Sequence, residues 1–427
     1  MPKKFQFISG YMVKWLTIAT LMGVGGGLSA YVLRSSIDLM ESVGGVFPIW
    51  LAPIFGGCLL SLIYLWDDEA AGFGTDKYLL AVNKRKEYQF KTKTLFSKVL
   101  ATATTLGFQG SGGVEGPMLV IGGCLDNLVR KIPILKKHLT KDDHRKLTIC
   151  GAAGAVGAIF RSPLGGGIFV VEILYKSSLP YYDLFPAILS STFGFVIFAM
   201  VKSGEPLFLI PDFLPSVENV PFFVLVGFLS GIASLIFMKI FSITGKVFQN
   251  LPMPKLHPIL GGIMTGLVIF FVSEAAGTGT SIIQYLIDYK VSITALILIL
   301  FAKMLATSFT VSSGGSGGLV IPALFIGAVC GNIVSGFVAV GDPGLSASLV
   351  IAGMAASLSG IANVPIAAAI MLVEMVGLQL GVPATIGSVM GYAVAQSSVI
   401  YNISSREGAE FKKNKAIRKS DRNLQEH

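Results

Sequence analysis

The sequence predicts an all-α polytopic membrane protein built from two halves of inverted topology. Its 427 residues have a mean hydropathy of +0.72, and only 13% of them are charged. A soluble protein of this length carries far more charge on its surface. Apolar runs of about 20 residues, the length that crosses a bilayer core, recur from Tyr11 to Ser397. Duplicated motifs at a nearly constant offset divide the chain into two equivalent halves.

The expected helical spans follow one another in both halves. In the first half, apolar runs occupy residues 11–33, 47–65, 94–108 and 184–201. In the second half, they occupy residues 221–248, 258–272, 293–308 and 384–396. Segments 151–174 and 353–376 each hold two short apolar stretches separated by a proline. Because proline ends or kinks a helix, we expect broken helices in these two segments.

Three pairs of motifs indicate the duplication. EAAGFGT at 69–75 returns as EAAGTGT at 274–280, and GSGGVEGP at 110–117 returns as GSGGLVIP at 315–322, both with the same offset. The third pair is GAAGAVGAIFRSPLGGGIFVVEIL at 151–174 and GMAASLSGIANVPIAAAIMLVEMV at 353–376. Its offset is slightly shorter, which a small difference in the length of one loop explains. Chance similarity between apolar helices would not keep this register. Glu172 and Glu374 are equivalent residues in the third pair, and we expect both to have a structural role and polar partners.

The distribution of charge predicts how the halves are oriented. The loop at 130–146 is strongly basic, whereas the equivalent loop at 339–348 carries only Asp342. Basic loops face the cytoplasm, so the two equivalent loops are expected on opposite sides of the membrane. The halves would then be inserted upside down relative to each other. We expect the protein in the cell (plasma or inner) membrane. The predicted organisation is a cytoplasmic N-terminus at 1–10, a first transmembrane repeat at 11–202, an extracytoplasmic connecting loop at 203–219, a second, inverted transmembrane repeat at 220–405 and a basic cytoplasmic tail at 406–427.

Glycine-rich breaks at 72–75, 113–117 and 318–322 predict helix starts inside the bilayer. Pro117 suits the first helical position, so Glu115 is expected just before it, beside amides that carry partial positive charge. Inverted repeats with broken helices place a substrate site near the middle of the membrane. Helix starts attract anions, and the breaks contain no Lys or Arg. We therefore expect an anion to bind there and to leave again.

Other function classes fit the sequence less well. The net charge of +9 is concentrated in loops and termini, which indicates cytoplasmic loops, not nucleic acid binding. An intramembrane enzyme needs a paired carboxylate, a Ser/His couple or a metal cluster, but the glycine motifs hold one carboxylate and no histidine. We expect no enzymatic activity, no cofactor and no metal. A cation-coupled transporter of organic solutes should instead show acidic or carbonyl-rich cation sites.

Four elements of the chain resemble the CLC family of chloride channels and chloride/proton exchangers, and the resemblance covers nearly the full length. GVEGP at 113–117 matches the family motif GxEGP, GLVIP at 318–322 stands where the family has GxFxP, GFG at 72–74 where it has GSGIP, and IYNIS at 400–404 holds the tyrosine near the inner mouth. The resemblance implies a CLC-like fold of many tilted, broken helices and a homodimer in the lipid bilayer with one pore per subunit. It also implies chloride or a related small anion as the substrate, with protons where transport is coupled.

The same resemblance assigns roles to individual residues. Glu115 becomes the gating glutamate: ionised, it occupies an anion site as an intramolecular competitor, and protonated, it swings away and lets anions pass. The amides of Leu319 and Val320 and the phenol of Tyr401 coordinate the central anion. The other expected anion-binding residues lie in the glycine breaks, and they are Phe73, Gly74, Gly113 and Gly116.

Two departures from the family pattern matter most, and a lesser one, Val320 in place of the motif phenylalanine, alters local packing more than the supply of amides. Phe73 replaces the serine that offers a hydroxyl to the anion, so backbone amides or the positive ring edge of Phe73 would have to substitute. Ile173 stands where exchangers commonly place an internal proton-transfer glutamate, and Glu172 before it points about 100° away on a helix. We therefore expect passive conduction of chloride or a related anion, gated by Glu115. The alternatives are a coupled chloride/proton antiporter, or a pore tuned to another anion such as fluoride or nitrate.

Overall fold

The computed structural model describes residues 3–83, 88–133, 139–140, 143–175 and 179–398 of the chain. The regular elements in these ranges are all helices, and one isolated β-bridge joins the two halves. Eight of the described helices are long and apolar enough to cross a membrane. The all-helical polytopic architecture expected from the composition is therefore confirmed.

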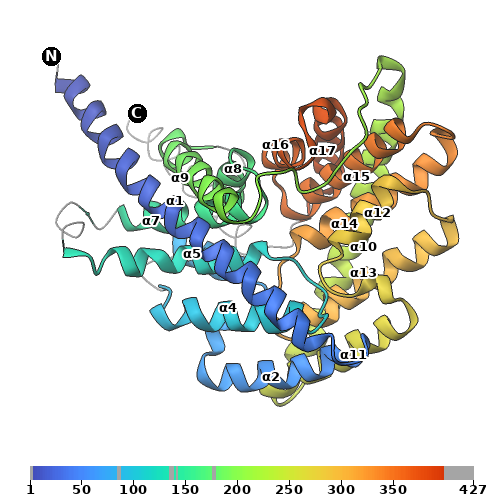
Figure 1. The fold of residues 1–427 in the computed structure, drawn as a ribbon, viewed down its shortest axis with the longest axis horizontal. Helices are drawn as coiled ribbons and strands as arrows, with labels where there is room; N and C mark the ends of the chain where they lie inside the picture. The colour runs from blue at the N-terminus through green and yellow to red at the C-terminus, as the bar shows by residue number, and fades with distance from the viewer. Residues whose placement is uncertain (1–2, 84–87, 134–138, 141–142, 176–178, 399–427) are drawn as a thin grey trace, which may run out of the picture.

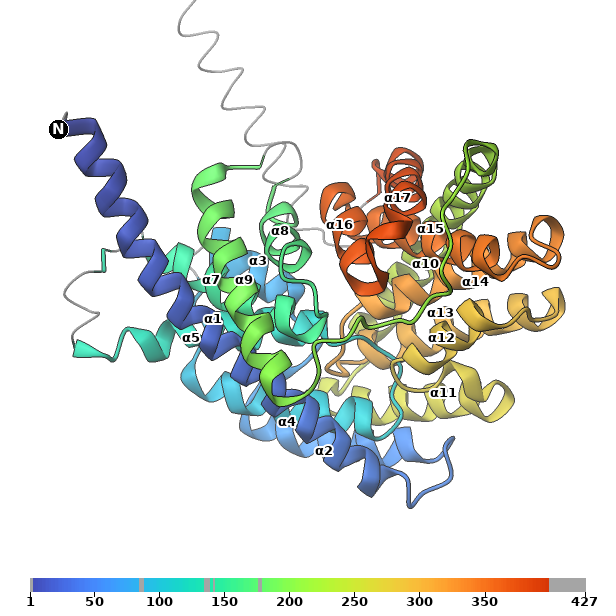
Figure 2. The ribbon, with the colours of Figure 1, turned by 45° about the horizontal axis from the view of Figure 1, so that its top comes forward.

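The two halves lie side by side, with the first in blue to green and the second in yellow-green to red (Figure 1). The helices of the first half are α1 (Lys3–Gly44), α2 (Ala52–Trp66), α3 (Thr75–Asn83), α4 (Thr92–Gly107), α5 (Glu115–Val129), α7 (Asp143–Ile159), α8 (Gly165–Glu172) and α9 (Tyr181–Val201). Those of the second half are α10 (Val220–Asn250), α11 (His257–Phe271), α12 (Thr280–Asp288), α13 (Ile293–Ser312), α14 (Val320–Val338), α15 (Pro343–Ala362), α16 (Pro365–Val376) and α17 (Gly381–Ala395). The segment between α9 and α10 crosses from one half to the other (Figure 2).

The first helix is much longer than the expected span at 11–33. It covers Lys3–Gly44, because an apolar run marks only the part of a helix that suits lipid, and the helix continues through polar residues on either side. One stabilising contact in the extension is an i,i+4 ion pair, in which the Nε atom of Arg34 lies 3.0 Å from Oδ1 of Asp38.

The helices after the glycine motifs begin earlier than the sequence predicted. α5 begins at Glu115 itself, so Pro117 is its third residue and not its first. α14 begins at Val320 in the same way, with Pro322 third. The first four amides of a helix have no acceptor within it, and proline is therefore tolerated at the third position as well. As a result, Glu115 belongs to the first turn of α5.

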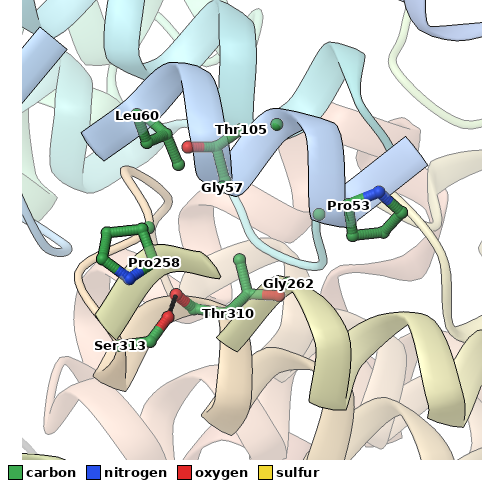
Figure 3. A pocket seen from close by; sticks show the side chains of 11 residues that line it. Pro53, Gly57, Leu60, Thr105, Pro258, Gly262, Thr310 and Ser313 are labelled. Atoms are coloured by element: carbon green, nitrogen blue, oxygen red, sulfur yellow. Dashed lines mark hydrogen bonds between the residues drawn. The ribbon is translucent and has the colours of Figure 1, made fainter. Parts of the chain in front are cut away.

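Equivalent elements of the two halves face each other and make mutual contacts. A cavity of about 20 Å³ between α2 and α11 is lined by residues of both halves (Figure 3). A Cβ atom on Gly57 would lie 2.4 Å from the oxygen of Pro258, and one on Gly262 would lie 2.3 Å from the oxygen of Pro53. Such mutual contact of equivalent residues is the relation expected of an inverted repeat. Four pairs of lining residues are separated by the offset of the glycine motifs, namely Pro53 and Pro258, Gly57 and Gly262, Thr105 and Thr310, and Gly110 and Gly315.

Glu172 and Glu374 connect the halves through reciprocal helix capping. Glu172, the last residue of α8, accepts hydrogen bonds from the amides of the second and third residues of α16, at 3.1 and 2.7 Å. Glu374 on α16 accepts hydrogen bonds from the amides of Leu164 and Gly165 at the start of α8, at 3.0 and 2.8 Å. Each carboxylate thus pairs with amides that have no acceptor in their own helix. The expectation that both residues have a structural role and polar partners is confirmed.

Candidate functional site

The two glycine motifs meet in the core, where Gly113 and Gly318 form the isolated β-bridge. The amide of Gly113 donates to the oxygen of Gly318 at 2.7 Å, and the amide of Gly318 donates to the oxygen of Gly113 at 2.6 Å. These two glycines occupy the same place in the duplicated motif, so the bridge joins equivalent points of the two halves. It holds the starts of α5 and α14 next to each other, deep inside the protein.

Glu115 lies at this junction and is completely buried. Its Oε1 atom accepts a hydrogen bond of 2.7 Å from the amide of Val320, the first residue of α14. Within the described ranges, its Oε2 atom has no hydrogen-bond donor. An acidic side chain of one half therefore accepts a hydrogen bond from an amide at a helix start of the other half. A free anion would make the same kind of contact with that amide.

Glycine is required on both sides of the carboxylate because the space is so narrow. A Cβ atom on Gly318 would lie 1.9 Å from Oε1 of Glu115, and a Cβ atom on Gly113 would lie 2.3 Å from Oε2. Neither glycine has a positive φ angle, so close approach and not backbone conformation explains their presence. The bridge and the carboxylate form one tightly packed unit.

We expect the substitution Gly318→Ala to expel the Glu115 carboxylate from the amide of Val320. The methyl group collides with the end of a flexible side chain, which can move while the fold is kept. Anion flux into reconstituted vesicles should then lose its dependence on pH. Gly317→Ala is the matched control, since its Cβ atom would lie 3.3 Å from its nearest neighbour, the Cα atom of Gly112. Equal pH dependence in the two variants would contradict the collision at Glu115.

The first glycine break packs against the start of α5. A Cβ atom on Gly116 would lie 1.9 Å from the carbonyl oxygen of Phe73, so glycine at 116 lets the two segments touch. Gly72 and Gly74 on either side of Phe73 have φ angles of +76° and +89°, which favour glycine. The Phe73 ring packs edge to face against Phe241 of α10, with 6.1 Å between centroids. A role for the ring edge toward an anion stays a prediction.

Two fully buried lysines, Lys98 of α4 and Lys303 of α13, reach the breaks, although the glycine motifs themselves contain no basic residue. The Nζ atom of Lys98 donates to the oxygens of Ala70 and Gly72, at 2.9 and 2.6 Å. The Nζ atom of Lys303 donates to the equivalent oxygens in the second half, at 3.2 and 2.8 Å. The two lysines are separated by the same offset as the glycine motifs, and this match is the signal in the sequence that singles them out. Ionisable residues buried at membrane depth are functional candidates.

The structure brings most of the expected site residues together. Leu319 is the N-cap residue of α14 and precedes Val320, and both are 1% exposed. Gly74 lies next to Gly116, since a Cβ atom on Gly74 would be 2.9 Å from the oxygen of Gly116. Ile173 is buried at the end of α8. Tyr401 lies outside the described residues, and its assignment stays a prediction.

A cavity of about 730 Å³ leads to the two helix starts from one face of the protein. Val114, the N-cap residue of α5, and Ile321, the second residue of α14, both line it. Its other walls come from the second part of α1, the turn after α7, the segment after α9, and α12. We name this cavity the vestibule. It reaches the immediate neighbours of Glu115 and Val320 in the chain.

The sequence is similar to one protein family and to several known proteins. The sequence profile of the family described as "Voltage gated chloride channel" matches residues 2–132 and 62–396. An uncharacterized protein of Methanocaldococcus jannaschii is 31% identical over 393 residues, which cover 91% of this chain and 95% of that protein. The H(+)/Cl(-) exchange transporter ClcA of Vibrio parahaemolyticus is 27% identical over 355 residues, which cover 79% of this chain and 74% of the transporter.

Solved structures show the same fold. A slow cyanobacterial Cl-/H+ antiporter superposes with a TM-score of 0.79 at 19% identity, covering 93% of this chain and 98% of the antiporter. A CLC-type fluoride/proton antiporter superposes with a TM-score of 0.77 at 20% identity, covering 92% and 97%. At these identities the likeness concerns the fold alone.

Proposed function

The chain belongs to the voltage-gated chloride channel family, and we propose that it exchanges a small inorganic anion for protons across the membrane. Anion transport of the CLC type is common to the family. Relatives support coupled exchange over passive conduction. The ClcA proteins are named exchange transporters, and two similar folds belong to antiporters. Passive conduction, which we expected from the sequence, lacks such support.

The observation that carries the proposal is the bond between Oε1 of Glu115 and the amide of Val320. Ionised Glu115 competes with the transported anion for this amide. A proton removes the charge of the carboxylate, weakens its hold on the helix start and frees the amide for an anion. Binding of a proton and binding of an anion at one site are thereby linked, as an exchanger requires.

One observation favours passive conduction as a second candidate. Ile173 cannot carry a proton, and Glu172 beside it is engaged with two amides of α16. A proton that reaches Glu115 therefore has no second carboxylate at the position where exchangers commonly keep one. The transported anion is chloride or a close relative, and the hydroxyl missing at Phe73 leaves fluoride and nitrate as candidates.

We also propose the placement of the protein in its membrane. It is an integral membrane protein with eight candidate spans among the described helices. The basic loop at 130–146 and the basic termini support a cytoplasmic location for both ends of the chain. The vestibule would then open to the opposite side, since residues of the connecting segment, Glu205 to Leu209, line it. By resemblance to its family, the protein assembles as a homodimer with one pathway per subunit.

Reconstituted vesicles with an outward chloride gradient test the function. Coupled exchange predicts that chloride leaving the vesicles drives protons inward against their own gradient, and that a proton uncoupler abolishes the gradient formed. Chloride flux without proton movement would support passive conduction instead. Repeating the assay with fluoride, bromide and nitrate identifies the substrate. A protein that moves none of these anions would refute the proposed function.

A further inference from the structure

The vestibule holds an uneven distribution of charge. Asp38 pairs with two of its basic groups, since Oδ1 lies 3.0 Å from Nε of Arg34 and Oδ2 lies 3.1 Å from Nζ of Lys202. These two cations share one carboxylate, which holds both of them in ion pairs and offsets one of their two positive charges. The lining includes three basic and three acidic side chains in all, which are Arg34, Arg161, Lys202, Asp38, Glu205 and Asp288.

Arg161 differs from the other two basic residues of the vestibule, because its guanidinium contacts backbone oxygens and not a carboxylate. Its Nη1 atom donates to the backbone oxygens of Glu205 and Pro206, at 2.8 and 3.4 Å. Carbonyl oxygens hold the guanidinium in place without forming an ion pair, and the carboxylate of Glu205 acts on its charge only from beyond ion-pair distance. No carboxylate of the described part of the chain forms an ion pair with it. Because a guanidinium carries five N–H donors, Arg161 can bind these two oxygens and still offer N–H groups to a ligand.

The backbone at Arg161 is strained for this residue type. Its φ angle is +53°, in the left-handed region, and that of Asn363, the equivalent residue of the third motif pair, is +59°. Both residues follow a long helix and precede a short one. Asparagine adopts left-handed angles readily after a helix, whereas arginine does so at a cost. The first half therefore keeps an arginine where the fold itself would favour asparagine, and strain of this kind points to function.

We propose that Arg161 forms a recruiting site for small inorganic anions in the vestibule, from which they move to the starts of α5 and α14. This inference rests on the proposed anion transport and adds a residue that sets affinity on one side of the membrane. Val114 and Ile321 at the inner end of the vestibule are apolar, so they offer an approaching anion no charge. The unpaired guanidinium supplies it, and attraction to a single charge raises the local anion concentration and the rate of binding.

The substitution Arg161→Asn tests this role, since it installs the residue that the equivalent position already has. Chloride uptake is measured in vesicles of defined orientation while chloride is varied on the vestibule side or on the opposite side. We expect the half-saturating chloride concentration to rise about three- to tenfold on the vestibule side only. The effect should shrink at high ionic strength, because salt screens exposed charges. The midpoint of thermal unfolding should stay the same or rise.

Two further variants separate recruitment from other causes. Arg161→Lys keeps the charge and should retain most of the affinity. Lys202→Gln also removes one positive charge from the vestibule, but one that an ion pair with Asp38 holds, so it should change the half-saturating concentration much less than Arg161→Asn does. An unchanged affinity in Arg161→Asn, an equal change on both sides, or an equal loss in Arg161→Lys would overturn the inference. Absence of anion transport in the unmodified protein would instead refute the proposed function.

Discussion

Replacement of Glu115 by glutamine should abolish proton movement while anion flux continues. Glutamine has nearly the shape of glutamate but cannot release or accept a proton over the range of pH in which proteins stay folded. In vesicles with a chloride gradient, we expect proton uptake to fall by at least about a hundredfold, the lower range for the loss of a side chain that transfers protons. Chloride flux should remain measurable and should no longer vary with pH.

The direction of the pH dependence follows from the contact that Glu115 makes. Protonation removes the negative charge that holds Oε1 on the amide of Val320. The unmodified protein should therefore pass anions faster as the pH falls, because a larger fraction of Glu115 is neutral. In Glu115→Gln, the side chain is neutral at every pH, so flux should stay near the acidic level of the unmodified protein.

Glu172→Gln provides a matched control for this experiment. It makes the same chemical change in another buried carboxyl group, one that caps the start of α16 and does not contact the glycine motifs. We expect lower thermal stability in this variant, because a charged acceptor of two hydrogen bonds is lost, and unchanged coupling between chloride and protons. Loss of coupling in Glu172→Gln with retention in Glu115→Gln would show that the proton uses a different carboxylate.

The architecture could be predicted from the sequence because duplication leaves a signal that needs no contact information. The offset between the glycine motifs makes Gly113 equivalent to Gly318, and the structure joins these two residues in a β-bridge. The helix starts at Glu115 and Val320 could be located closely from the glycine and proline pattern alone. The structure therefore largely confirms the helix starts that the local motifs predict.

Interactions between distant segments could not be predicted in this way. The partners of Glu172 lie 194 and 195 residues away, and nothing near Glu172 in the sequence identifies them. The left-handed angle of Arg161 was equally hidden, since arginine does not signal such a conformation as glycine does. The contact between Lys98 and the oxygen of Gly72 joins two separate segments, and α4 shows no motif around this lysine. Comparison of the two halves could have marked Lys98 through its equivalent, Lys303, but could not have named the oxygens that they bind.

Lys98→Met should have the second largest effect, on both stability and anion affinity. Methionine fills a similar volume but leaves the oxygens of Ala70 and Gly72 without their donor in a buried environment. We expect a loss of about 2 to 5 kcal/mol of stability, from two unsatisfied acceptors. Gly72 directly precedes Phe73, whose oxygen touches Gly116 at the start of α5. Loosening of this break should lower anion affinity about tenfold, as measured by isothermal titration with chloride in detergent.

Lys303→Met shows whether Lys98 acts as a positioning residue or only as a buried charge. It removes the same two contacts from the second half, to the oxygens of Ala275 and Gly277, and so should cost similar stability. The residue equivalent to Phe73 in that half is Thr278, which lines the vestibule and is not part of the expected anion site. Affinity should therefore fall much less than in Lys98→Met. If both variants weakened anion binding equally, the lysines would act through their charge, and the ordering of the first break would not explain the effect.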